Sequence, residues 1–194
     1  MRYSLSLILC FSLLTACVQD VVKIDDESAD QQSSMSDSDK RVYKRALEGI
    51  KKKRLKQAQV ILNKLLKKYP NASGVLANKA VIYASKNRLS KAEEFFEKSL
   101  KINDKLVQAR NNLAVIYRKK GKFSEAERML EAAIVSNPYY ASAYYNLGIL
   151  QELYLHKPDK ALENYRLYLD LKKAGDKRVS QWVSLLQRQL KSRK

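Results

Sequence analysis

Residues 109–138, ARNNLAVIYRKKGKFSEAERMLEAAIVSNP, contain two amphipathic segments separated by a short basic break. In the first segment, Leu113, Ala114 and Tyr117 have the spacing that puts residues on one face of an α-helix. In the second, small and apolar residues share a face in the same way: Ala126, Leu130, Ala133 and Ile134. The break contains Gly121, which can adopt the positive φ of a tight turn. The stretch closes with Asn-Pro, so the sequence predicts two antiparallel helices joined by a turn.

The same pattern returns along the chain with a period of 34 residues. One small-residue position is occupied by Ala46, Ala80, Ala114 and Gly148. A second is occupied by Ala58, Ala92 and Ala126, and then by Ala161, which comes one residue late. Aligning 73–106 with 107–140 without gaps gives 11 identities in 34 positions. Self-similarity at a fixed period of this length is typical of a repeat array.

Two copies of the pattern depart from it. The first, 39–72, has Arg45 and Gly49 at positions where apolar residues are expected. The fourth, 141–175, begins faithfully with ASAYYNLGIL but is stretched by one residue around LHKPDKA. It also has Gln151 where the two preceding copies have tyrosine.

These positions resemble the consensus of the tetratricopeptide repeat (TPR): Leu-Gly/Ala, Tyr, Ala, a bulky residue, Ala and a closing Pro. The resemblance implies an all-α, right-handed solenoid of helix-turn-helix units. The four repeats would span 39–72, 73–106, 107–140 and 141–175. In the third repeat, we expect Ser124 to be the N-cap of the second helix.

The segment after the repeats predicts one more helix. Residues 176–194 carry an apolar stripe at helical spacing, formed by Val179, Trp182, Val183, Leu186 and Leu190. Repeat arrays need a terminal element with a polar outer face. We therefore expect a C-terminal solvating helix, with Trp182 packed on the last repeat rather than contacting a ligand.

The N-terminus has the features of an export signal. Arg2 precedes an apolar run that is too short for the roughly 20 residues of a membrane-spanning helix. The run ends in LTAC, residues 14–17, which resembles the lipobox of bacterial lipoproteins. The resemblance implies removal of residues 1–16, acylation of Cys17 and, because Val18 follows it, an outer-membrane location facing the periplasm. The alternative is an ordinary secretory signal in which Cys17 is incidental.

Charge divides the rest of the chain. Residues 18–39 carry a net charge of −6, whereas residues 40–194 contain 36 basic and 13 acidic residues, a net charge of +23. The acidic segment lacks aromatic residues and any sustained period, so we expect residues 17–38 to be a flexible tether behind the lipidated cysteine. The only other cysteine, Cys10, lies in the signal, so the mature chain would have no disulfide.

The residues available for chemistry predict that this protein is not an enzyme. His156 is the only histidine, the mature chain has no free thiol, and none of the five glycines forms a phosphate-binding loop. Nucleophilic or metal-assisted catalysis requires several such groups together. We therefore expect no catalytic residue, no metal site and no cofactor.

The TPR resemblance implies a concave groove, lined by the first helix of each repeat, that binds a protein or peptide. Our candidate groove residues are Asn78, Asn111, Asn112, Arg118, Lys119, Tyr145 and Asn146. The periodic asparagines could hydrogen-bond a peptide backbone or hold neighbouring helices together, and both interpretations stay open. Some TPR proteins clamp a terminal carboxylate, but the small apolar groove positions of the second repeat make a full clamp doubtful.

The charge of the basic body suggests an anionic partner. Nucleic acid is excluded from our prediction because the chain is expected to be exported and its cations are not interleaved with stacking aromatics. Anionic lipids, cell-wall polymers or an acidic protein suit the charge better. We expect a scaffold for a cell-envelope complex, similar to TPR lipoproteins that assist pilus, secretion or transport machinery. The alternatives are an adaptor of cell-wall enzymes and an electrostatic binder of anionic polymers.

Overall fold

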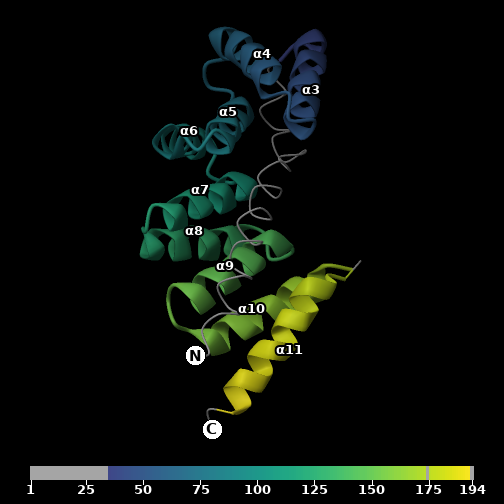
Figure 1. The fold of residues 1–194 in the computed structure, drawn as a ribbon. Helices are drawn as coiled ribbons and strands as arrows, with labels where there is room; N and C mark the ends of the chain where they lie inside the picture. The colour runs from purple at the N-terminus through teal and green to yellow at the C-terminus, as the bar shows by residue number, and fades with distance from the viewer. Residues whose placement is uncertain (1–34, 174, 193–194) are drawn as a thin grey trace. The chain divides into compact units, whose positions relative to one another are not determined.

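The computed structural model describes residues 35–173 and 175–192, which form nine α-helices and no strand (Figure 1). The first helices of the four pairs are α3 (Asp37–Lys51), α5 (Ser73–Ser85), α7 (Val107–Lys119) and α9 (Ala141–Leu153). The second helices are α4 (Leu55–Lys68), α6 (Leu89–Ile102), α8 (Phe123–Ser136) and α10 (Pro158–Leu171), and α11 (Lys177–Lys191) follows. The all-α fold with a final helix is as predicted. The expected signal, Cys17 and the tether up to residue 34 lie outside the described residues.

The helix starts confirm the period. Helices α5, α7 and α9 begin at residues 73, 107 and 141, and α4, α6 and α8 begin at residues 55, 89 and 123. The fourth pair is stretched as expected, because α10 begins at residue 158, 35 residues after α8. In the part of the chain that is described, no helix has the length and apolar character needed to cross a membrane.

The turn inside each pair has the same backbone conformation. One residue there has positive φ in all four pairs: Lys53 (57°), Asn87 (55°), Gly121 (74°) and His156 (53°). The expectation for Gly121 is confirmed, and the repeat requires this conformation even where the residue has a Cβ. A left-handed conformation costs roughly 1–2 kcal/mol for most such residues. The only histidine of the chain is therefore a turn residue.

The prediction that Ser124 caps α8 is wrong. The helix begins at Phe123, its N-cap is Lys122, and no side chain caps it. The left-handed turn leads directly into the helix, and the carbonyl oxygen of Lys122 accepts from the N–H of Ala126 at 3.0 Å. Side-chain caps are instead found on the first and last described helices, where Ser36 caps α3 and Asp176 caps α11.

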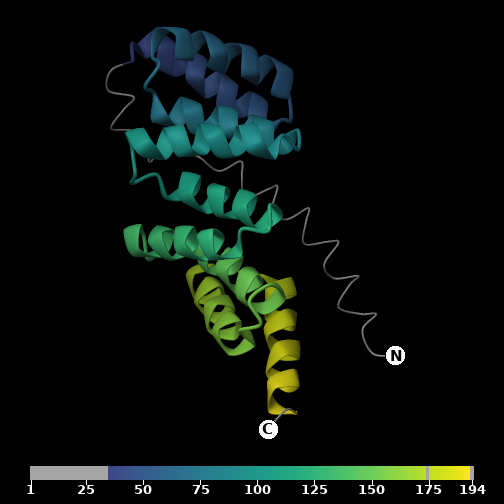
Figure 2. The same ribbon diagram turned by 90° about the vertical axis from the view of Figure 1, so that its left-hand side faces the viewer.

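The chain divides into two compact units within α7, after Asn112, and each is described by itself. In the first unit, α3 packs on α4, α4 on α5, and α5 on α6 (Figure 2). The predicted small positions, Ala46, Ala58, Ala80 and Ala92, are fully buried there. Large side chains such as Leu62 and Phe96 fill the space between them. Alanine at these positions lets the paired helices approach closely.

In the second unit, α9 packs on both α8 and α10, and α11 packs on α10. Gly148 takes the place of the alanines because the ring of Tyr165, the counterpart of Leu130, lies directly against it. A Cβ on Gly148 would lie 2.5 Å from Cε1 of Tyr165. On α11, Trp182 stacks on Tyr165 with ring centroids 5.0 Å apart. The predicted packing of Trp182 on the last repeat is confirmed.

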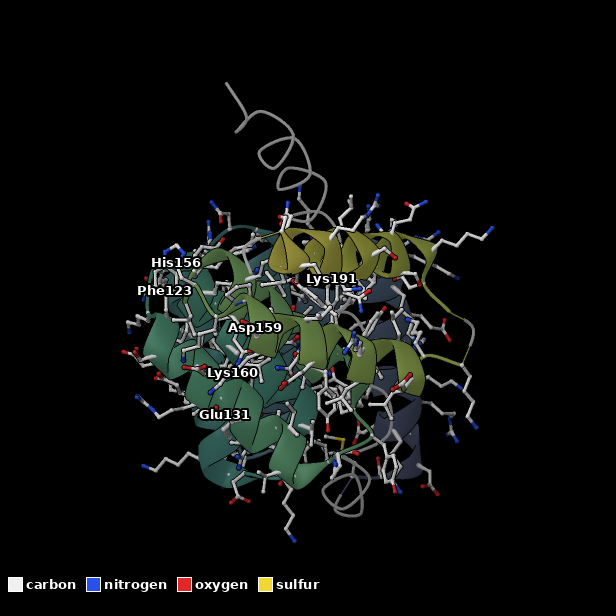
Figure 3. The ribbon with its side chains drawn as sticks, turned by 90° about the horizontal axis from the view of Figure 1, so that it is seen from below. Phe123, Glu131, His156, Asp159, Lys160 and Lys191 are labelled. Carbon is white, nitrogen blue, oxygen red and sulfur yellow. The ribbon has the colours of Figure 1, made fainter. Side chains whose placement is uncertain are left out.

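Gln151, which replaces the repeat tyrosine, organises the stretched turn between α9 and α10. Its Oε1 accepts from Asn164 Nδ2 at 2.9 Å, and its Nε2 donates to Glu127 Oε1 at 3.4 Å. Lys157 donates to both carboxylate oxygens of Glu127, at 2.9 and 3.1 Å. Figure 3 labels His156 in this turn and Phe123 at the start of α8, and the ring of Tyr154 packs on Phe123 with centroids 4.8 Å apart. A short polar network therefore stabilises the turn that contains the extra residue of the fourth repeat.

Candidate functional site

Asn78 joins two helices of the first unit. It lies on α5 and is 2% exposed. Its Nδ2 donates to Tyr43 Oη on α3 at 2.6 Å and to the carbonyl oxygen of Gly74 at 2.9 Å. Both donor hydrogens are used, so the structure favours the helix-holding interpretation for this asparagine.

Asn112 has the same place in the next repeat but a different environment. It is 1% exposed, and its Nδ2 has no hydrogen-bond partner. Tyr43 precedes Asn78 by 35 residues, and the residue at that distance before Asn112 is Ala77, which has no hydroxyl group. The Oδ1 of Asn112 accepts from Asn111 Nδ2 at 3.5 Å, and Asn111 is also buried. The two periodic asparagines are therefore not equivalent.

Gln108, which our candidate list omitted, lies one helical turn before Asn112 on α7. It is 8% exposed, and its Oε1 has no hydrogen-bond partner. Buried polar atoms without a partner are rare, and each calls for an explanation. Here α7 holds one unused acceptor and one unused donor on neighbouring turns. A polar residue at this first-helix position was visible in the sequence, but its lack of a partner was not.

The two cationic candidates lie at the C-terminal end of α7, where positive charge interacts favourably with the helix dipole. Lys119 is exposed and Arg118 is half-buried. The guanidinium carbon of Arg118 lies 5.8 Å from the ring centroid of Tyr154. Tyr154 in turn packs on Phe123 at 4.8 Å. This aromatic support orients Arg118, whereas Lys119 remains accessible.

The last two candidates, Tyr145 and Asn146, are buried on α9. The ring of Tyr145 packs on Tyr168 at 5.1 Å and on Tyr165 at 6.4 Å between centroids. Tyr145 therefore belongs to the aromatic core of the second unit. Of the seven candidates, three lie in the first unit and four in the second, and only Arg118 and Lys119 are not fully buried.

Sequence reasoning missed one ionisable group near that core. Glu152, on α9, accepts a hydrogen bond from Tyr165 Oη at 2.9 Å. Burial raises the pKa of Glu152 above its ordinary value, and hydrogen bonds from Tyr165 and Trp182 partly oppose the shift. Burial also raises the pKa of Tyr165. Over the described ranges, no three side chains of the metal-binding types come together.

Comparison with family models finds tetratricopeptide repeats over most of the array. Three TPR models match residues 42–72, 73–106 and 106–136. A sequence search of curated proteins found no significant match.

Solved structures show the same fold. PilF of Pseudomonas aeruginosa superimposes with a TM-score of 0.72 at 22% identity, covering 79% of this chain and 69% of that one. MamA gives a TM-score of 0.63 at 26% identity, covering 73% of this chain and 81% of that one. The first TPR domain of RPAP3 (Spaghetti), bound to the HSP90 peptide SRMEEVD, gives 0.57 at 22% identity, covering 61% and 92%.

Proposed function

Because this chain is a tetratricopeptide repeat protein, we propose that it is a non-enzymatic scaffold that binds a protein or peptide partner. The TPR family is generally an interaction module, and the TPR domain of RPAP3 holds a peptide. The observation that carries the proposal for this chain is the pair of unused amide atoms on α7.

Gln108 Oε1 needs a donor and Asn112 Nδ2 needs an acceptor. An unsatisfied buried polar group costs about 1–3 kcal/mol. A peptide backbone offers an N–H and a C=O in every residue, so one bound segment can satisfy both atoms. Both atoms are enclosed, and a peptide reaches them only when neighbouring side chains rotate aside.

The charge of the partner is suggested by Arg118 and Lys119. Both are cations in the last turn of α7. The RPAP3 peptide, SRMEEVD, contains three acidic residues. An acidic segment would suit the same chemistry in this protein, although a full carboxylate clamp is not part of the proposal.

Asn78 and Asn112 form a matched pair for testing the proposal. We expect Asn112→Ala to weaken partner binding about two- to tenfold, as for one hydrogen bond, with little change in stability. Asn78→Ala should lower the free energy of unfolding by about 1–3 kcal/mol, because it leaves Tyr43 and Gly74 without their bonds. Partners captured by crosslinking in cells, quantified by mass spectrometry, and thermal melts check the two expectations. Unchanged capture by Asn112→Ala would contradict this binding mode.

The proposed setting is the cell envelope. The lipobox at residues 14–17 supports a lipid anchor at Cys17 and an outer-membrane location facing the periplasm. In that setting the scaffold would support assembly or stability of an envelope complex, such as pilus, secretion or transport machinery.

A second candidate, electrostatic binding of anionic envelope polymers or lipids, is favoured by the first helix pair. Residues 40–72 contain 12 basic residues and one acidic residue. Nine exposed cations there have no ion pair with any described acidic residue: Arg41, Lys44, Arg45, Lys52, Lys53, Arg54, Lys56, Lys64 and Lys67. Binding of this kind weakens steeply as salt rises, because exposed charges are screened beyond about 8–10 Å. If high salt abolishes partner capture by both the parent protein and Asn112→Ala, electrostatic binding would be favoured over peptide binding.

A further inference from the structure

Lys79 occupies a position that the repeat reserves for an apolar residue. The equivalent residues in the next two repeats are Leu113 and Leu147, which are 2% and 5% exposed, whereas the degenerate first repeat has the exposed Arg45. Lys79 is half-buried on α5. A lysine in place of a core leucine sacrifices hydrophobic burial, so the substitution needs a reason other than packing.

The ammonium group of Lys79 lies over an aromatic pair with two other lysines around it. Tyr83 stacks on Phe95 with centroids 5.3 Å apart. Nζ of Lys79 lies 4.6 Å and Nζ of Lys98 lies 5.5 Å from the Phe95 centroid. Nζ of Lys91 lies 5.6 Å from the Tyr83 centroid. Three cations from α5 and α6 therefore surround one partly exposed aromatic surface in the first unit.

The positive charge of this cluster is only partly balanced. Glu94 pairs with Lys98 at 2.6 Å, whereas Lys79 and Lys91 have no ion pair with a described acidic residue. Burial lowers the pKa of Lys79, the nearby charges of Lys91 and Lys98 lower it further, and the charge of Glu94 opposes the shift in part. An anion placed among the three ammonium groups would offset this repulsion and the loss of hydration together.

We propose that Lys79, Lys91 and Lys98 form a recognition site for a carboxylate of an acidic partner segment. The Tyr83–Phe95 pair supplies an apolar wall for the aliphatic part of the bound glutamate or aspartate. The inference builds on the proposed binding function but assigns it to another surface, on α5 and α6, away from Gln108 and Asn112. Inorganic phosphate is also an anion, and it is the alternative ligand for the three ammonium groups.

Lys79→Leu introduces the leucine of the third and fourth repeats, so it removes the cation while improving the packing. The probes are a hexaglutamate peptide, a matched hexaglutamine peptide and inorganic phosphate, titrated into the purified full-length chain by calorimetry. We expect Lys79→Leu to raise Tm by about 2–4 °C, as for about 1 kcal/mol in a chain of this size, and to weaken hexaglutamate binding about fivefold. The control is Lys101→Gln, because Lys101 is exposed on the same helix α6 and should change neither quantity.

A second measurement reports on this site alone, apart from the basic first helix pair. NMR of the lysine ¹³Cε groups should show the Lys79 pKa rising on addition of hexaglutamate, and little change with hexaglutamine. Equal hexaglutamate affinity of Lys79→Leu and the parent, an unchanged Lys79 resonance, or a stronger response to phosphate than to hexaglutamate would overturn the inference. Loss of partner capture in Asn112→Ala with these negative results would leave the proposed function standing and remove only this site.

Discussion

Gly148 and Tyr165 show how the placement of one side chain determines its neighbour. Three repeats combine alanine on the first helix with leucine or phenylalanine on the second: Ala46 with Leu62, Ala80 with Phe96, and Ala114 with Leu130. The fourth has Tyr165, and its ring occupies the space that a Cβ on residue 148 would need. Glycine is therefore required by close approach and not by backbone conformation.

We predict that Gly148→Ala lowers the free energy of unfolding by about 1–3 kcal/mol, because overpacking displaces the buried ring. In a Tyr165→Leu background the same change should be neutral or stabilising, since alanine then faces the leucine of the other repeats and favours the helix. Urea unfolding of the four proteins of this double-mutant cycle measures the coupling. Equal effects in both backgrounds would show that Tyr165 is not the cause.

At the same scale, the periodic asparagines mark the limit of sequence reasoning about the site. Asn78 and Asn112 are identical in spacing and in their neighbours Ala80 and Ala114. They differ because Asn78 meets the hydroxyl group of a tyrosine from the preceding repeat and Asn112 meets none. That difference depends on which residues of adjacent repeats touch, and period alone does not specify those contacts.

At the scale of elements, the contact between α11 and the last repeat includes one ionisable group, the carboxyl group of Glu152. Trp182 of α11 stacks on Tyr165 of α10, and both side chains hydrogen-bond to Glu152 of α9. Three helices thus meet at one carboxyl group with a raised pKa. Protonation of Glu152 removes the cost of a buried charge at this junction.

We predict that Glu152→Gln stabilises the protein at neutral pH. The folded pKa of Glu152 is raised, so the parent keeps the full contribution of this group below the unfolded pKa of about 4.3 and loses it as pH rises through the folded value. Glutamine keeps an acceptor for Tyr165 and is neutral throughout. Thermal melts from pH 4 to pH 8 should show the variant more stable at high pH, with the difference vanishing toward pH 4. A constant difference across this range would contradict the raised pKa.

The helices themselves were largely predictable, since the 34-residue period, the small positions and the one-residue stretch of the fourth repeat are properties of local pattern. The N-cap of α8 was not, because the left-handed turn residue replaces the serine cap that isolated helices favour. The Lys79 cluster was visible in part: alignment places Lys79 on Leu113 and Leu147. Its closeness to Phe95 required the packing of α5 on α6.

At the scale of the whole molecule, we propose that a lipid anchor at Cys17 precedes the acidic N-terminal segment and the basic body. We predict that the protein fractionates with outer membranes and that its mature form begins at an acylated Cys17. Cys17→Ser should leave the precursor uncleaved, which intact mass spectrometry detects. A mature N-terminus at another residue, without acyl chains, would show that the lipobox interpretation is wrong.

The stacking of Trp182 on Tyr165 also gives this protein a built-in optical reporter. The chain has a single tryptophan, so its emission comes from one place, the contact between α11 and α10. The wavelength and intensity of that emission depend on solvent contact and on the nearby tyrosine ring. Fluorescence therefore follows the release of the terminal helix, while circular dichroism follows the loss of all helices. Comparing the two signals during denaturation separates fraying at the C-terminal end from unfolding of the repeats.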